Sequence, residues 1–198
     1  MLHKCLDANW NYRLPDFLDW ILWGFGEAMN ENGDQPKIDS KTNEKWYRLF
    51  NLGLLLTNPT DYWGELYSET KGRGSWNRTG FYPTPQNVCN MICKMTMQSD
   101  LDKAEKNGQD TRILSVMEPA VGTGRMLLEA SNYSVNLWGM DVDRVCVNAT
   151  KINGFLYAPW MVRPAPWLQK NDMSKTMPIR KNPTGIVHQQ IGLFDQAA

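Results

Sequence analysis

The sequence has few of the residues that bind metals or form disulfide bonds. Its 198 residues include four cysteines and two histidines, and no two cysteines form a Cys-x-x-Cys pair. Structural zinc sites usually combine such pairs with further cysteines or histidines, so the composition does not predict one. Cys89 and Cys93 are four residues apart and would share one face of a helix. We expect the cysteines to be reduced, buried thiols.

An excess of charge and a long hydrophobic run are also lacking. Acidic and basic residues balance at 21 each, whereas proteins that bind DNA by charge alone are usually basic. Any contact with DNA is therefore expected to be local or to come through a partner. The apolar stretch at residues 17–29 contains Asp19 and Glu27 and is too short to span a bilayer. Without a signal-peptide pattern, we expect a cytoplasmic protein with no membrane partner.

Aromatic residues are abundant, and many of them fall in the first 80 residues. Hydrophobic spacing predicts helices over residues 14–30, 44–57 and 60–68, which together define an N-terminal helical region at residues 1–80. Four tryptophans in this region could pack in a core or stack on nucleic-acid bases, and we favour the core: Trp10, Trp20, Trp23 and Trp46.

From residue 81 the pattern changes to an alternation of helices and strands. Thr84 as N-cap and Pro85 as the first helical residue predict a helix, followed by a hydrophilic connector at residues 99–112. The apolar positions of this helix form a stripe: Val88, Met91, Ile92 and Met95.

Two short apolar runs follow, at residues 113–117 and 135–140, and each precedes a predicted helix, at residues 125–131 and 143–153. This alternation predicts an α/β fold with a Rossmann-like parallel sheet at residues 81–185 and a tail at residues 186–198.

A glycine-rich bend joins the first predicted strand to its helix. It reads Glu-Pro-Ala-Val-Gly-Thr-Gly at residues 118–124, and Asp141 follows the next predicted strand. Glycines let the backbone turn sharply beside a ligand, and a carboxylate at the second strand can accept hydrogen bonds from ribose hydroxyls. The dinucleotide pattern GxGxxG fails at Leu127, and no P-loop lysine follows the bend. An ordinary strand–turn–helix remains the alternative.

Three segments resemble one enzyme family. The string EPAVGTGRML at residues 118–127 resembles motif I of N6-adenine DNA methyltransferases that use S-adenosylmethionine (SAM), including type I modification subunits. FYPTP at residues 81–85 resembles the segment before motif I, and LWGMDVDRVCVNATKIN at residues 137–153 resembles the family's second strand and helix. The resemblance implies a SAM-binding domain.

The resemblance also implies roles for individual residues. Thr84 would lie near the methionine carboxylate, although a helix cap is the alternative. Asp141 would bind the ribose hydroxyls and Val142 would lie against the adenine. Asp172 would accept from the adenine amino group, with a solvated loop residue as the alternative. The other implied cofactor-binding residues are Tyr82, Glu118, Pro119, Ala120, Gly122, Thr123 and Gly124.

The family's catalytic tetrad, Asn/Asp/Ser-Pro-Pro-aromatic, has no complete match. In the family it holds the adenine amino group and stacks on the flipped base. The nearest candidate is Asn182 in Asn-Pro-Thr-Gly, which lacks the second proline and the aromatic residue. Three explanations of the incomplete tetrad remain. The chain is a degenerate SAM binder, it is half of an enzyme that a second methyltransferase subunit completes, or it is an enzyme with a non-standard site. We favour the first two combined, which leaves enzymatic activity open.

The C-terminal string Gln-Ile-Gly-Leu-Phe resembles the peptide that docks bacterial proteins on the DNA-polymerase sliding clamp. Leu193 and Phe194 would enter an apolar pocket and Gln190 would bond at its rim. A short terminal strand on the sheet edge is the alternative.

These patterns favour a DNA adenine methyltransferase-like protein of a phage or mobile element. The alternatives are a non-catalytic SAM-binding adaptor of the clamp or of a restriction-modification complex, and a small-molecule or protein methyltransferase. Basic residues that could touch DNA phosphates, or simply form a solvated face, are Lys71, Arg73, Arg78, Arg163, Lys170, Lys175, Arg180 and Lys181.

Overall fold

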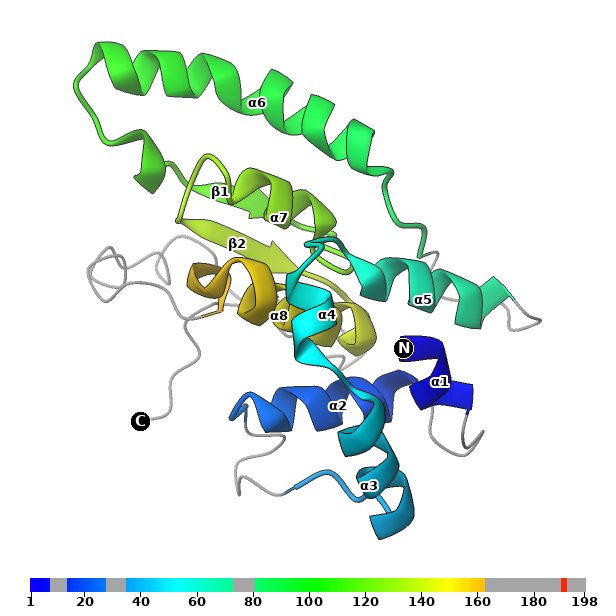
Figure 1. Cartoon of the computed structure of the whole chain (residues 1–198). Coiled ribbons are helices and arrows are strands. Elements are labelled where there is room, and N and C mark those ends of the chain that lie inside the picture. The colour runs from blue at the N-terminus through cyan, green and yellow to red at the C-terminus, as the bar shows by residue number, and fades with distance from the viewer. Residues whose placement is uncertain (8–13, 28–34, 73–80, 163–189, 192–198) are drawn as a thin grey trace, which may run out of the picture.

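The computed structural model describes residues 1–7, 14–27, 35–72, 81–162 and 190–191 (Figure 1). The fold is mixed α/β and mostly helical, with a pair of parallel strands at its centre. The elements in chain order are α1 (Leu2–Asp7), α2 (Leu14–Gly24), α3 (Ser40–Leu49), α4 (Leu52–Leu56), α5 (Tyr62–Gly72), α6 (Gln86–Lys106), η1 (Thr111–Ile113), β1 (Val116–Glu118), α7 (Arg125–Ala130), β2 (Leu137–Met140), α8 (Arg144–Tyr157), η2 (Pro159–Met161) and β3 (Gln190–Ile191).

The N-terminal helices differ from the predicted ones at their ends. The prediction of one helix over residues 44–57 is wrong, because Asn51 interrupts it and its side chain accepts from Leu54 N at 3.3 Å to start α4. Helix α2 ends earlier than predicted, since Gly26 adopts a left-handed conformation with φ 84° and its N–H bonds back to Trp23 O. Helix α1 was not predicted.

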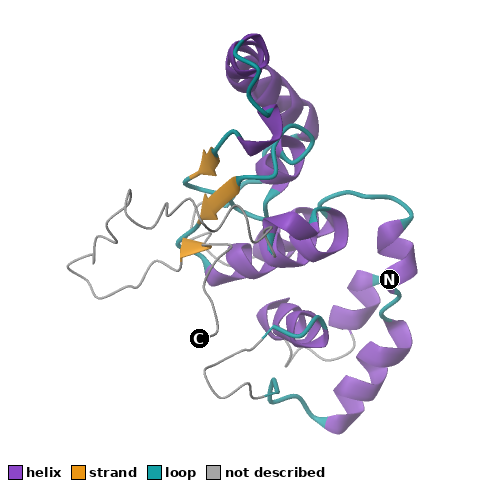
Figure 2. Cartoon of the chain, turned by 90° about the vertical axis from the view of Figure 1, so that its left-hand side faces the viewer, coloured by secondary structure: helices purple, strands orange, loops and turns teal. Residues whose placement is uncertain are grey.

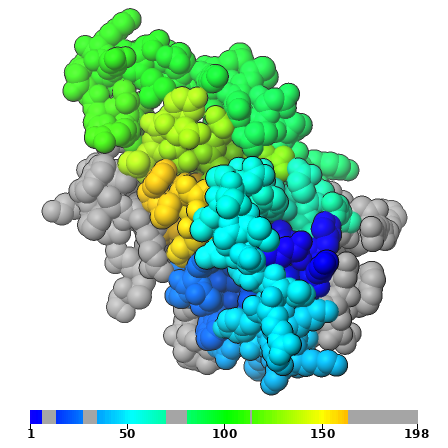
Figure 3. Space-filling model, in the orientation of Figure 1, coloured from blue at the N-terminus to red at the C-terminus, as the bar shows by residue number. Residues whose placement is uncertain are grey.

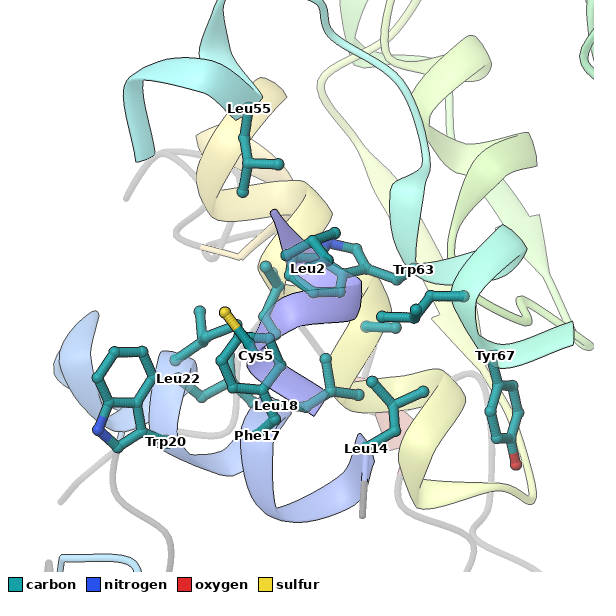
Figure 4. Close-up of a cluster of buried hydrophobic side chains, with 14 of the residues drawn as sticks. Leu2, Cys5, Leu14, Phe17, Leu18, Trp20, Leu22, Leu55, Trp63 and Tyr67 are labelled. Carbon is teal, nitrogen blue, oxygen red and sulfur yellow. The ribbon is translucent and has the colours of Figure 1, made fainter. Parts of the chain in front are cut away.

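The first hydrophobic core lies between these helices and α8. Phe17 packs against Trp46 with ring centroids 4.9 Å apart, and Trp46 Nε1 donates to Cys5 O at 3.0 Å. Figure 4 shows Phe17, Leu18 and Cys5 gathered at the centre of this cluster. Core packing is thus confirmed for Trp20 and Trp46, both of which are buried. Trp23 is half-buried, and Trp10 lies outside the described residues.

Helix α8 contributes to this core from the other half of the chain. Its buried side chains in the cluster are Cys146, Ala149, Ile152 and Leu156. In the space-filling view, the cyan surface of α4 lies directly against the yellow and orange surface of α8 (Figure 3). The N-terminal helical region therefore shares this core with α8 of the predicted SAM-binding region. A second core cluster lies between α6, α7, the strands and the other side of α8.

Helix α6 packs through a different face from the one predicted. The predicted stripe is wrong for Met91 and Met95, which are exposed, whereas Cys89, Cys93 and Met97 face inward. Burial, reinforced by the nearby Glu129 carboxylate, raises the pKa of the Cys93 thiol to about 11. All four cysteines are free and buried, as expected.

The ends of α6 also differ from the prediction. Pro85 is the N-cap rather than the first helical residue, so Thr84 lies one position further out, and no described side chain caps this helix. The helix runs on to Lys106, through the segment predicted as a connector.

The two central strands pair in parallel, as predicted. Val116 is opposite Leu137, and Glu118 is opposite Gly139. Strand β3 pairs antiparallel with β2 on its other side, with Gln190 opposite Met140 (Figure 2). Together, the described residues form this small sheet and not a full Rossmann-like one. No helix in the described ranges is both long and apolar enough to cross a membrane.

Candidate nucleoside-binding site

The glycine bend after β1 has a backbone that only glycine tolerates well. Gly122 and Gly124 have φ values of 56° and 88°, in the left-handed region. A Cβ on Gly124 would lie 2.9 Å from Thr150 Cγ2, and one on Gly122 would lie 3.3 Å from the Phe81 ring. Both conformation and space therefore require glycine at Gly124, which explains the close approach of the bend to α8.

Asp141 lies directly beside this bend, as the sequence predicts. Gly122 N donates to Asp141 Oδ2 at 2.8 Å, and Asp143 N donates to Asp141 Oδ1 at 2.8 Å. Ala120 N similarly donates to Glu118 Oε1 at 3.1 Å. Two amides of the bend are thus already bonded to carboxylates of the protein itself. They are not available to hold a phosphate, which is the usual ligand of glycine-rich bends at a helix start.

A cavity of about 350 Å³ opens over the bend. Its volume falls within the range of small-molecule sites, ~300–1,000 Å³. The cavity brings together seven of the predicted cofactor-binding residues: Tyr82, Thr84, Glu118, Ala120, Gly122, Thr123 and Asp141. The other wall residues are Phe81, Pro83, Val121, Arg125, Met126, Asp143 and Cys146.

The remaining predicted site residues have other positions. Pro119, Gly124 and Val142 are not in the cavity wall, and the Val142 side chain is exposed. Gln190 lies in β3, at the place that the terminal-strand alternative predicts for the tail. Four predicted residues lie outside the described part of the chain: Asp172, Asn182, Leu193 and Phe194.

The charged residues of the cavity wall are mainly acidic. Glu118, Asp141 and Asp143 contribute carboxylates, whereas Arg125 is its one basic residue. Asp143 also caps α8 by accepting from Val145 N at 2.9 Å, and the Tyr67 hydroxyl donates to its other oxygen. Carboxylates accept hydrogen bonds from hydroxyl and amino groups, so the wall suits a ligand rich in such donors. In the described ranges, no group of three His, Cys, Asp or Glu side chains is placed to hold a metal ion.

Asp61, which the sequence analysis did not single out, supports the bend from the N-terminal region. Its buried carboxylate accepts from Thr123 Oγ1 at 2.6 Å and from Asn153 Nδ2 at 2.8 Å. It also caps α5 by accepting from Gly64 N at 3.0 Å. The sequence predicts this helix to begin at residue 60, which places Asp61 inside it, whereas α5 begins at Tyr62 and Asp61 is its cap. Nothing in the local sequence indicates the contact with Thr123.

Helix α8 holds the same bend from the opposite side. Thr150 Oγ1 donates to Gly122 O at 2.9 Å, and Asn153 Nδ2 donates to Thr123 O at 2.8 Å. These two residues are one helical turn apart, so they face the bend together. The bend is therefore fixed by side chains from both α5 and α8.

Arg125 is a further wall residue that the sequence analysis passed over. It stands at the first position of α7, directly after the bend, and its guanidinium is in contact with Asp61, Glu65 and the Thr84 carbonyl. Its position directly after the glycine bend was visible in the sequence, but its inward direction was not.

No protein-family model, curated protein or solved structure matches the chain. The interpretation of the cavity therefore depends on its own residues and geometry. The resemblance to adenine methyltransferases stays a prediction, carried by the three segments quoted above.

Proposed function

We propose that the cavity binds SAM and that the chain is a DNA adenine N6-methyltransferase-like protein with an incomplete catalytic motif. The observation that carries this proposal is the placement of Asp141 at the end of β2, bonded to Gly122 N of the bend at 2.8 Å and lining an open cavity. A carboxylate in that position can accept from the ribose hydroxyls of an adenosyl group. The parallel strands β1 and β2 would then be the start of a Rossmann-like sheet.

The charge of the cavity favours SAM over nucleotides that contain phosphate. Ala120 N and Gly122 N are occupied by carboxylates, and Glu118 and Asp141 would repel a phosphate placed beside the bend. SAM carries hydroxyls, an amino group and a positively charged sulfonium, all of which suit carboxylate neighbours. When bound, SAM would supply an activated methyl group.

The residues that would hold a target adenine are not assigned. Asn182 is the candidate that the sequence offers, and it lies outside the described residues. We therefore propose that a second subunit completes the site, or that the chain acts as a SAM-binding adaptor without transfer activity. The chain would bind DNA directly or through that partner.

Calorimetric titration with SAM tests the proposal directly. The wild type is expected to bind, and Asp141→Asn to weaken binding about tenfold or more, because hydrogen bonds to a charged group are lost. Asp110→Asn is the matched control, since Asp110 is exposed, pairs with Arg112 and is not part of the cavity wall. Absence of SAM binding by the wild type would refute the proposal.

Transfer of a labelled methyl group from SAM to DNA separates the enzyme from the adaptor. Transfer that Asn182→Ala abolishes would support the enzyme, whereas SAM binding without transfer, with or without a second subunit, would support the adaptor.

A pull-down of the sliding clamp tests the tail. Clamp docking predicts binding that is lost when Leu193 and Phe194 are both replaced by alanine.

A further inference from the structure

Arg125 is the one basic residue of the cavity wall, whose other charged residues are acidic. Its side chain is only 11% exposed. Nε donates to Asp61 Oδ2 at 3.2 Å, and Nη1 donates to Thr84 O at 2.9 Å. Nη2 donates to Glu65 Oε1 at 2.9 Å and, at 3.5 Å, to Asp61 O. The guanidinium is therefore held in a fixed orientation at the Thr84 side of the cavity.

We propose that Arg125 recognises the α-carboxylate of the ligand's amino-acid end, and that Glu65 weakens this recognition by sharing the positive charge of Arg125. This inference rests on the proposed function, because it assigns one end of the same ligand. It makes Arg125 the determinant that separates a nucleoside with an amino-acid tail from one without it.

The donor count of Arg125 supports a ligand contact. A guanidinium has five N–H donors, and the contacts with described residues use four: one on Nε, one on Nη1 and two on Nη2. The fifth donor belongs to Nη1, the nitrogen that bonds to the Thr84 carbonyl, and Thr84 is itself a wall residue. A carboxylate in this part of the cavity would meet a charged donor.

The two carboxylate partners of Arg125 differ in their surroundings. The Asp61 side chain is 1% exposed and bonded on both oxygens, so it is a permanent partner that holds the guanidinium in place. The Glu65 side chain is 67% exposed and reaches Arg125 from the surface of α5. Removing the charge of Glu65 should leave the fold intact and leave Arg125 more positive toward an anionic ligand group.

Two ligands isolate the amino-acid end. SAM and 5′-methylthioadenosine share the thioadenosine part, but only SAM has the α-carboxylate. Glu65→Gln is expected to raise the affinity for SAM about two- to fivefold, the range of an exposed ion pair, and to leave that for 5′-methylthioadenosine unchanged. Arg125→Lys keeps the charge beside Asp61 but loses the planar fork, so SAM affinity should fall about tenfold with little change for 5′-methylthioadenosine.

Glu69→Gln is the matched control for the surface charge. Glu69 lies one turn further along α5, forms a 3.4 Å ion pair with His3, and is not in the cavity wall. Its replacement should change neither affinity. Thermal unfolding of each variant shows whether the fold is retained, and the Glu65→Gln result decides the matter if Arg125→Lys unfolds.

The outcomes separate this inference from the proposed function. If the wild type binds both ligands and Glu65→Gln leaves SAM affinity unchanged or lower, the role of Arg125 is refuted and the nucleoside site stands. Equal losses for both ligands in a folded Arg125→Lys variant refute it in the same way. If the wild type binds neither ligand, the proposed function fails, and this inference fails with it.

Discussion

Thr123 donates its hydroxyl hydrogen bond to Asp61 at 2.6 Å, across 62 positions of the chain. Thr123 lies in the glycine bend, whereas Asp61 caps α5 in the N-terminal helical region. Both residues are buried, and Asn153 of α8 bonds to each of them. The N-terminal helices therefore help to support the cavity. Substitutions that destabilise these helices are expected to disturb the cavity as well.

Replacing Asp61 tests this support. Asp61→Asn removes the charge that neutralises the buried Arg125 and is expected to lower the free energy of unfolding by about 3 kcal/mol. Asp39→Asn is the control, since Asp39 caps α3 through Thr42 N and lies on the surface; it should cost less than about 1 kcal/mol. Urea unfolding measures both. A loss for Asp61→Asn no larger than that of the control would contradict the role of the pair.

Two glycines with the same backbone conformation separate strain from crowding. Gly124 and Gly26 have φ values of 88° and 84°, but only a Cβ on Gly124 would meet another atom, Thr150 Cγ2 at 2.9 Å. Gly26→Ala should cost about 1 kcal/mol from the left-handed backbone alone. Gly124→Ala should cost about 1–3 kcal/mol more, because the added methyl group overpacks the contact with α8. If thermal or urea unfolding shows equal losses of unfolding free energy for the two variants, α8 shifts to accommodate the added methyl group.

The buried thiol of Cys93 predicts a loss of stability in alkali. Its folded pKa is about 11, above the ordinary value, so the unfolded chain loses this proton first as the pH rises. The stability is complete below the unfolded pKa and declines between about pH 9 and pH 11, by about 1 kcal/mol at pH 10. Cys93→Ala should remove this part of the pH dependence. Urea unfolding of both proteins at pH 8, 9 and 10 measures it, and identical slopes would contradict the prediction.

Ligand-induced stabilisation tests the occupied amides of the bend. SAM at about 100 times its dissociation constant should raise the free energy of unfolding by about 2.7 kcal/mol. NAD and ATP should produce no comparable shift of the melting temperature, because Ala120 N and Gly122 N already bond to carboxylates. Stabilisation by NAD or ATP but not by SAM would show that the bend rearranges to hold phosphate.

The sequence was informative where a local pattern determines the structure. The strand–bend–helix at residues 116–130, the second strand and α8 follow from apolar runs and glycines. The parallel pairing of β1 with β2 places the bend beside the end of β2, where Gly122 contacts Asp141. Five of the seven predicted residues that meet in the cavity come from these segments: Glu118, Ala120, Gly122, Thr123 and Asp141.

The sequence was less informative where the interactions are distant or the helix is polar. Residues 99–106 are hydrophilic, yet they continue α6, which is supported by surface pairs such as Gln98 with Asp102 at 2.7 Å. The inward positions Met97, Leu101 and Ala104 keep a helical spacing through this segment, but the charged residues between them mask it. Asp61 and Arg125 meet only after the chain has folded, so no spacing in the sequence indicates their contact.

The bonds that fix the glycine bend have a thermodynamic consequence for recognition. Its conformation is held by hydrogen bonds with Asp141, Thr150 and Asn153 of the protein itself. The entropy of ordering this segment is therefore lost during folding rather than at the encounter with a nucleoside. Preorganisation of this kind lets a small molecule dock against a rigid floor, so that its affinity reflects its own contacts rather than the closing of a loop.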